Sequence, residues 1–185
     1  DNPDFLEAAK YVCAPPLRKP TDCSALAAAL SADEIQTIST DHCSFTLAQK
    51  DAGRDDFTRI PGGLPGVETR GTLIYSALVA PGTLSLSQMV RVLSEQPAKL
   101  YGMWPRKGVI APGCDADIVV YDPDADTVIA AADQLSAAGY TPYEGFRTRG
   151  SIRSVYLRGT LAVDRGQVLE DRLGQYVKRE KPIFF

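Results

Sequence analysis

The feature that most constrains the fold is a β-branched, apolar run that ends in a single acidic residue. Residues 35–40 read Ile-Gln-Thr-Ile-Ser-Thr, and Asp41 follows directly. Ile and Thr favour extended backbone because their branched side chains pack well on a pleated surface, so we predict a strand that stops at Asp41. A carboxylate at the carboxyl end of a barrel strand faces the mouth, where such barrels carry out their chemistry. The alternative is an ordinary turn or helix-capping aspartate.

The segments around this run predict alternating strands and helices. Residues 11–13 form a short apolar strand that a Pro-Pro pair ends. Thr21 or Asp22 can cap a helix over the Ala- and Leu-rich residues 23–30. Strand, helix and strand in this order make a βαβ unit and hence a parallel sheet. Residues 46–64 show no clear period, so we expect a long loop over the barrel mouth.

Helical patterning returns in the middle of the chain. Residues 72–80 are predicted to be helical. Ser85 and Gln88, three positions apart, form a capping box at the start of a second helix with an apolar face. Pro97 is placed to start a further short helix, and Gly102 to end it.

After residue 104 the sequence predicts a small antiparallel β unit. Short strand candidates alternate there with Gly, Pro and Asp, and they cover residues 107–110, 117–121, 127–130, 152–157 and 160–164. Residues 158–159 and 164–167 are typical of hairpin turns. We therefore divide the chain into 1–107, with the barrel elements, and 108–185, with the β unit. The last ten residues should lie across another surface or a neighbouring subunit.

Composition excludes several classes of protein. Hydrophobic residues make up 44% of the 185 and charged residues 23%, with a net charge of -3. There is no polycationic surface for nucleic acid, and no apolar run of about 18 residues predicts a membrane span. Cys13, Cys23, Cys43 and Cys114 are widely spaced, which suits reduced thiols in a cytoplasmic protein. Cys43 next to Asp41 could be a nucleophile, but a small buried filler is the favoured interpretation.

The length favours part of a larger protein. The chain opens at Asp1 without a Met, and a complete (β/α)₈ barrel takes about 250 residues. We therefore expect a C-terminal portion of a longer polypeptide.

Eight short sequence motifs follow one another along nearly the whole chain. They are Cys-Ala-Pro-Pro-Leu-Arg at 13–18, Thr-Asp-His-Cys-Ser-Phe at 40–45, Asp-Phe-Thr-Arg-Ile-Pro-Gly-Gly at 56–63, Pro-Gly-Val-Glu-Thr-Arg at 65–70, Pro-Ala-Lys-Leu-Tyr-Gly at 97–102, Arg-Lys-Gly at 106–108, Pro-Gly-Cys-Asp-Ala-Asp-Ile-Val at 112–119 and Tyr-Thr-Pro-Tyr-Glu-Gly at 140–145. The ordered set resembles the C-terminal part of the dihydropyrimidinase and D-hydantoinase family, within the cyclic amidohydrolases.

This resemblance implies an α/β fold: the C-terminal part of a metal-dependent (β/α)₈ TIM barrel, followed by part of a small β-sandwich domain. The N-terminal part of the same enzyme would complete both. The resemblance also implies a cytoplasmic homotetramer whose substrate is a small cyclic amide or ureide, with neither nucleic acid nor membrane as a partner.

The family opens such rings with water at two divalent metal ions, zinc by resemblance, held by four His, a carboxylated Lys and one Asp. Only the Asp has a match here, Asp41. By resemblance it ligates one metal, takes the proton from the attacking hydroxide and passes it to the leaving nitrogen. The other ligands, the carboxylated Lys included, would precede residue 1, so the isolated chain should be inactive. His42 is not assigned to the metal, because adjacent strand residues point to opposite faces, and we expect it to pack or to support the site.

Two further positions resemble the family's contacts with the substrate ring. Ala14 stands where the family commonly has Ser, and Gly62 where it commonly has Asn. Backbone groups can match the alternating N–H and C=O groups of a cyclic amide without side chains. The ring could be a hydantoin, a dihydropyrimidine or another cyclic imide. The alternative for Gly62 is a plain flexible turn.

Two other functions stay open. One is a non-catalytic scaffold such as the collapsin response mediator proteins, which the substitutions at Ala14 and Gly62 permit but Asp41 disfavours. The other is a related ring opener, an allantoinase or dihydroorotase. The upstream sequence would separate all three, because an enzyme requires a His-x-His pair, a lysine for carboxylation and two more His.

Several charged residues have structural explanations. We expect Glu68 and Arg70 to form an ion pair, and Asp115 and Asp117 to shape the turn into the next strand. Residues 140–145 should form a packed aromatic turn.

Overall fold

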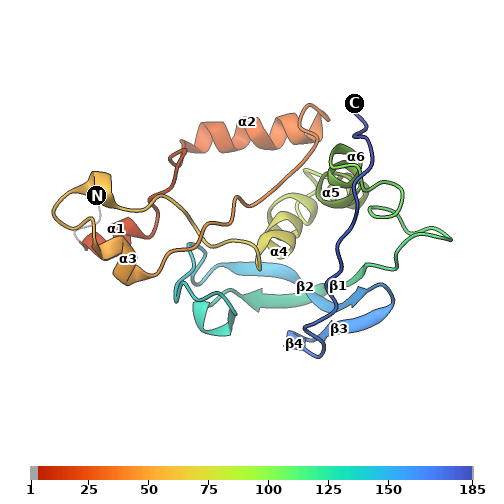
Figure 1. Ribbon diagram of the computed structural model, residues 1–185. Coiled ribbons are helices and arrows are strands. Elements are labelled where there is room, and N and C mark those ends of the chain that lie inside the picture. Colours follow the sequence, from red (N-terminus) through yellow and green to blue (C-terminus); the bar gives the residue numbers. More distant parts are fainter. Residues whose placement is uncertain (1–3, 185) are drawn as a thin grey trace.

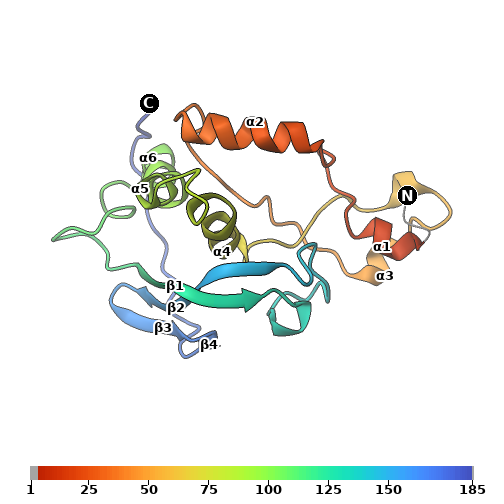
Figure 2. The same ribbon diagram turned by 180° about the vertical axis from the view of Figure 1, so that it is seen from behind.

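The computed structural model describes residues 4–184 and shows a mixed α/β arrangement with one antiparallel sheet. Helix α4 and the helical residues after it lie against the sheet, while α2 runs far from it (Figures 1 and 2). Helices α1 and α3 lie side by side at one end of the molecule, and α5 and α6 lie at the other (Figure 1). Among the described residues, no helix has the length and apolar character that a bilayer crossing requires.

The sheet has four strands in the order β1-β2-β3-β4. They are β1 (Ile118–Val128), β2 (Arg147–Leu157), β3 (Thr160–Asp164) and β4 (Gln167–Val168). The two predicted hairpin turns are confirmed. Arg158 and Gly159 have φ of 48° and 82°, and Arg165 and Gly166 have 46° and 78°, the positive values that a two-residue turn needs to match the twist of its strands.

Two strand predictions differ from the structure. The candidates at 117–121 and 127–130 belong to one long strand, β1, whose pairing with β2 is irregular between Asp122 and Asp126. Residues 107–110 are not a strand at all. Gly108 has φ of 84°, and a Cβ there would lie 2.6 Å from the Ala98 Cβ. The chain turns tightly against α6 at this point, so it cannot stay extended.

The first two helices lie close to where the sequence places them: the helical end expected over residues 5–11 is present, and the helix expected over residues 23–30 begins earlier. Helix α1 spans Phe5–Ala9 and α2 spans Pro20–Ser31. Pro20 suits the first turn of α2 because its φ is already helical and its missing N–H is not needed there. Asp22 therefore lies inside the helix, where its carboxylate accepts the Lys19 backbone N–H at 3.0 Å.

The predicted loop over 46–64 contains two helical segments, α3 (Leu47–Asp51) and a 3₁₀ turn (Phe57–Arg59). Thr46 and Gln49 form a capping box: the Gln49 N–H donates to Thr46 Oγ1 at 3.2 Å, and the Thr46 N–H donates to Gln49 Oε1 at 2.8 Å. This Thr-x-x-Gln signature is visible in the sequence, so the loop prediction was wrong for a local reason.

The helical predictions for the middle of the chain are confirmed. The segments are α4 (Arg70–Ile74) with a π-helical continuation (Tyr75–Val79), and α5 (Leu86–Val90) with a π-helical segment (Arg91–Glu95) that leads into α6 (Gln96–Leu100). Ser85 caps α5 through Gln88 as expected. Pro97 lies within the first turn of α6, and Gly102, with φ of 67°, follows its end.

The predicted strands 11–13 and 35–40 are not hydrogen-bonded strands, and Tyr11 belongs to the turn after α1, where its N–H donates to the Ala8 carbonyl at 3.1 Å. A strand is defined by its ladder to a neighbour, and among the described residues the only bridge near Asp41 joins His42 to Leu64 in parallel. The Ile38 N–H instead donates to the Val92 carbonyl at 3.1 Å.

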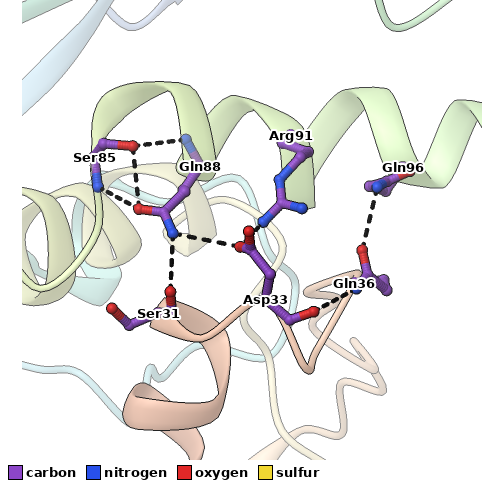
Figure 3. A network of polar contacts seen from close by, with 7 residues as sticks. All are labelled: Ser31, Asp33, Gln36, Ser85, Gln88, Arg91 and Gln96. Atoms are coloured by element: carbon purple, nitrogen blue, oxygen red, sulfur yellow. Dashed lines mark hydrogen bonds and ion pairs between the residues drawn. The ribbon is translucent and has the colours of Figure 1, made fainter. Parts of the chain in front are cut away.

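A polar network, drawn in Figure 3, and a small apolar core hold the segment that leads to Asp41. The Gln88 amide donates to the Ser31 carbonyl at 3.1 Å, Arg91 pairs with Asp33, and the Gln96 amide donates to Gln36 Oε1 at 3.1 Å. The core residues are Leu30, Leu84 and Val92, against which Ile35 and Ile38 pack. The helix from α5 to α6 thus fixes residues 31–38.

The C-terminal residues run over α6 (Figure 1). The Glu180 N–H donates to the Gly102 carbonyl at 2.7 Å, and the Ile183 N–H to the Lys99 carbonyl at 3.0 Å. The prediction that the tail lies across another surface is confirmed for this contact.

The helical layer and the sheet meet at two tyrosines. The rings of Tyr75 and Tyr121 lie 4.6 Å apart, and the Tyr121 hydroxyl donates to the Arg149 carbonyl at 3.3 Å. Burial, with a smaller contribution from Tyr75, raises the pKa of Tyr121 to about 12.

This raised pKa predicts a loss of stability in alkali. An unfolded tyrosine ionises near pH 10, so between about pH 10 and 12 the folded state keeps a proton that the unfolded state has lost, and stability falls as pH rises through this window. Urea unfolding of wild type and Tyr121→Phe at pH 9 and at about pH 11.5 measures the effect. The decrease should be smaller in Tyr121→Phe, and an identical decrease would contradict this account.

Candidate functional site

Backbone hydrogen bonds link three segments that are far apart in the sequence. They are residues 12–14, 41–43 and 62–64. The Gly63 N–H donates to the Val12 carbonyl at 3.1 Å, and the Cys43 N–H donates to the Leu64 carbonyl at 3.1 Å. Residues that are far apart in the sequence are thereby brought to one place, and each segment carries one of the predicted site residues.

The structure brings Ala14 and Gly62 together. A Cβ built on Gly62 would lie 3.4 Å from the Ala14 backbone N and 3.5 Å from the Ala14 Cβ. Both residues are exposed. They present backbone groups and no polar side chain, so any recognition here would use N–H and C=O groups.

Asp41 is exposed and lies at a turn in the backbone. Its φ is 46°, in the left-handed region that Asp tolerates better than most residues. Among residues 4–184, no hydrogen bond or ion pair occupies its carboxylate. A carboxylate in this state can accept a ligand or a proton. The positive φ also shows that Asp41 is not in regular strand, so strand alternation does not fix its direction relative to His42.

His42 has a packing role. Its Nδ1 accepts the backbone N–H groups of Gly66 at 3.1 Å and Val67 at 3.2 Å, so in this arrangement the ring proton is on Nε2. These contacts tie residues 65–67 to the segment that carries Asp41. They occupy one of the two ring nitrogens that could bind a metal, in agreement with the prediction that His42 supports the site.

Lys50 was missed by the sequence analysis. It lies on α3 with a relative exposure of 0%, and its Nζ donates to the carbonyls of Val12 at 2.7 Å, Pro61 at 2.8 Å and Gly63 at 3.0 Å. Burial lowers the pKa of Lys50, against the opposing effect of the Cys13 and Cys43 thiols. The capping box at Thr46 could have placed Lys50 on a helix, but no local signal marks its burial.

Of the two predictions about the cysteines, one is confirmed and the other is wrong. All four thiols are free, as expected. Cys43, however, is exposed and not a buried filler. It is Gly63 that is buried, and it packs against the Cys43 backbone, so the close contact at this position is made by main chain.

The predicted ion pair between Glu68 and Arg70 is wrong. Glu68 instead accepts two backbone N–H groups from a distant loop, Leu135 to Oε2 and Ser136 to Oε1, each at 2.9 Å. Two unpaired backbone donors offer this carboxylate a better fit than a neighbouring side chain. Asp117 Oδ1 accepts the Arg158 N–H at 2.8 Å, a contact with the turn between β2 and β3 and not with the predicted turn into β1.

Asp115 and Asp117 both pair with Lys107. Hydrogen bonding to Lys107, and more weakly to Arg106, holds the pKa of Asp115 below its usual value against the opposing effect of burial. This cluster lies before β1, away from Asp41, and it stabilises the turn between α6 and the sheet.

The described residues supply part of a metal site at most. No three His, Cys, Asp or Glu side chains within residues 4–184 gather in a way that could hold a metal ion. Of these residues, Asp41 has a carboxylate with no partner, whose oxygens are chemically suited to a divalent cation. A cavity of about 170 Å³ lies behind the segment, against Thr40, Leu64 and Arg70, and it does not include Ala14, Asp41 or Gly62 among its lining residues.

Comparison with known proteins finds one consistent group. D-hydantoinase of Ralstonia pickettii is 44% identical over 183 residues, 98% of this chain and 40% of that protein. D-hydantoinase of Geobacillus stearothermophilus is 43% identical over 98% of this chain and 39% of that protein. The crystal structure of dihydropyrimidinase from Brevibacillus agri superposes with a TM-score of 0.95 at 42% identity, over 99% of this chain and 40% of that one.

The chain spans about two fifths of the length of these relatives. The profile of the Amidohydrolase family matches residues 7–162, which include all three segments of the candidate site. With this match over most of its length, the chain belongs to the amidohydrolase family.

Proposed function

We propose that this chain is the C-terminal portion of a metal-dependent cyclic amidohydrolase that opens hydantoin- or dihydropyrimidine-type rings with water. The observation that carries the proposal is the backbone hydrogen bonding that joins the segment after Asp41 to the segments of Ala14 and Gly62, which lie next to each other. Identity of 44% to D-hydantoinase over nearly the whole chain supports it.

In this proposal residues 1–107 contribute the last strands and helices of a (β/α)₈ barrel, and residues 108–185 contribute part of a small β-sandwich domain with the C-terminal tail. Two features support this division. The antiparallel sheet begins only at Ile118, and the predicted strand segments before it have no ladder of their own, as barrel strands would not if their neighbours came from the N-terminal part of the enzyme.

Asp41 would serve as both ligand and base. Asp41 would hold one of two divalent metal ions, zinc in this proposal, together with a carboxylated lysine outside this chain. When bound, the ions would supply polarisation of the ring carbonyl and a pKa of water lowered towards 7. The Asp41 carboxylate takes the proton of the attacking water and delivers it to the ring nitrogen as the C–N bond breaks. A carboxylate beside cations stays ionised until the proton arrives, which suits this transfer.

Ala14 and Gly62 would hold the ring through their backbone. A cyclic amide or ureide presents alternating donors and acceptors, which peptide groups complement directly. Neither residue adds a polar side chain, so specificity among ring substituents would depend on shape.

The enzyme would work as a homotetramer in the cytoplasm, a compartment to which the four free thiols are suited.

The experiment is a substrate panel on the full-length protein. Hydantoin and dihydrouracil should be opened, with allantoin and dihydroorotate much slower, as followed by loss of ring absorbance. Turnover only of allantoin or dihydroorotate would favour the related ring openers. No turnover of any ring by a folded, metal-supplemented protein would favour the scaffold function, which the substitutions at Ala14 and Gly62 would then explain.

A further inference from the structure

Lys50 is a buried cation that the proposed reaction does not use. Its side chain is fully excluded from solvent. An ammonium group has three donors, and all three are engaged, by the carbonyls of Val12, Pro61 and Gly63. The Phe45 ring also lies 5.8 Å from Nζ. Among the described residues no carboxylate pairs with Lys50, so backbone carbonyl dipoles, together with the Phe45 ring, compensate for its burial.

The three carbonyls belong to the two segments that carry the candidate substrate contacts. Val12 precedes Ala14 by two residues, and Pro61 and Gly63 flank Gly62 on either side. One atom, Nζ, therefore joins both segments from the buried side, while Ala14 and Gly62 are exposed on the other. Within residues 4–184, a single backbone hydrogen bond, from the Gly63 N–H to the Val12 carbonyl, also joins these segments.

We infer that Lys50 is a positioning residue, whose ammonium group sets the separation of the Ala14 and Gly62 backbones and thereby the binding of the ring. This inference rests on the proposed function. Lys50 does not contact the substrate; it acts through the two peptide segments. Hydrogen bonds from a charged donor are stronger than those from a neutral one, and a neutral amine has only two protons to donate, so it could hold only two of the three carbonyls.

The test compares Lys50→Met and Lys50→Arg in the full-length protein. Methionine keeps the length of the side chain but removes the donors, and arginine keeps the charge with a planar group that does not match three converging carbonyls. The matched control is Lys99→Met, since Lys99 is a half-buried lysine on α6 that pairs with Glu95, away from the site. Values of kcat and KM for hydantoin, bound metal, and the unfolding midpoint are measured for each.

A shift of the two segments should weaken ring binding. We expect Lys50→Met to lower kcat/KM by about tenfold to a hundredfold, mainly through a higher KM, with bound metal unchanged. The KM of Lys50→Arg should lie between those of wild type and Lys50→Met. The kcat/KM of Lys99→Met should stay within about twofold of wild type. A purely structural role would instead lower the unfolding midpoint and the active fraction while leaving KM as in wild type.

The outcomes are distinct. A folded Lys50→Met protein with the KM of wild type overturns the inference and leaves the proposed function standing. If Lys50→Met does not fold, a folded Lys50→Arg variant with the wild-type KM overturns it in the same way. Absence of turnover in wild type itself removes the proposed function, and the inference with it.

Discussion

Asp41→Asn in the full-length protein is expected to reduce ring opening by about 10²- to 10⁴-fold, the range that general acid–base catalysis contributes. Asparagine has nearly the same shape, but its amide cannot take the proton of the attacking water and is a poor ligand for a divalent metal. The measurement is kcat for hydantoin or dihydrouracil.

The fold should survive this substitution. The Asp41 carboxylate makes no hydrogen bond or ion pair within the described part of the chain, and Asn tolerates a φ of 46° as readily as Asp does. The unfolding midpoint should therefore match wild type. Asp55→Asn is the control, because Asp55 is exposed on the loop after α3 and should keep full activity. Equal activity of the two variants would remove Asp41 from the site.

Gly63→Ala is expected to have the second-largest effect, on both stability and turnover. A Cβ at this buried position would lie 2.4 Å from the Cys43 carbonyl oxygen and 2.9 Å from the Cys43 Cβ. The oxygen is backbone and cannot rotate away, so the segments of Gly63 and Cys43 must separate. We expect a loss of about 3 kcal/mol in the free energy of unfolding, at the upper end for overpacking, measured by urea denaturation.

Gly62→Ala is the matched control for stability. The Cβ of that variant would meet its nearest atoms at 3.4 to 3.6 Å, close to ordinary contact, so its unfolding free energy should change by less than about 1 kcal/mol. Both substitutions remove the same backbone freedom of a glycine. The difference in unfolding free energy between the two variants therefore measures the close approach to Cys43. Equal stability of the two variants would contradict the close contact between Gly63 and the Cys43 backbone.

Local signals in the sequence predicted the elements that depend on neighbouring residues. The capping box of Ser85 and Gln88 placed α5, and the paired residues Arg158 and Gly159 placed the turn between β2 and β3. The same kind of signal at Thr46 was present but not used, and α3 was missed for that reason. Where the two residues of a capping box lie three positions apart, the sequence alone is sufficient to predict where the helix begins.

Contacts between distant residues could not be predicted in this way. Glu68 binds backbone donors 67 and 68 positions away, and Lys50 binds a carbonyl 38 positions earlier. Both side chains would ordinarily be assigned to the surface. Their partners become available only once the chain has folded, because backbone groups of irregular segments must find donors or acceptors somewhere.

The candidate site was predicted in its members but not in its geometry. Asp41, Ala14 and Gly62 were each identified from ordered sequence words, and the structure shows that Ala14 and Gly62 lie next to one another. The expectation that Asp41 ends a regular strand was wrong, because a strand is made by its neighbours and the described residues offer this segment a single bridge, at His42. Its role in chemistry stays a prediction.

The central claim is that Asp41 completes a metal centre whose other ligands lie outside this chain, and bound metal in the full-length protein tests it most directly. After purification with zinc, wild type should hold about two metal ions per chain, as two-metal hydrolytic sites do. Asp41→Asn should hold fewer and lose them sooner to a chelator, while Asp55→Asn should match wild type. Equal occupancy in wild type and Asp41→Asn, or no bound metal in an active wild-type protein, would contradict the account.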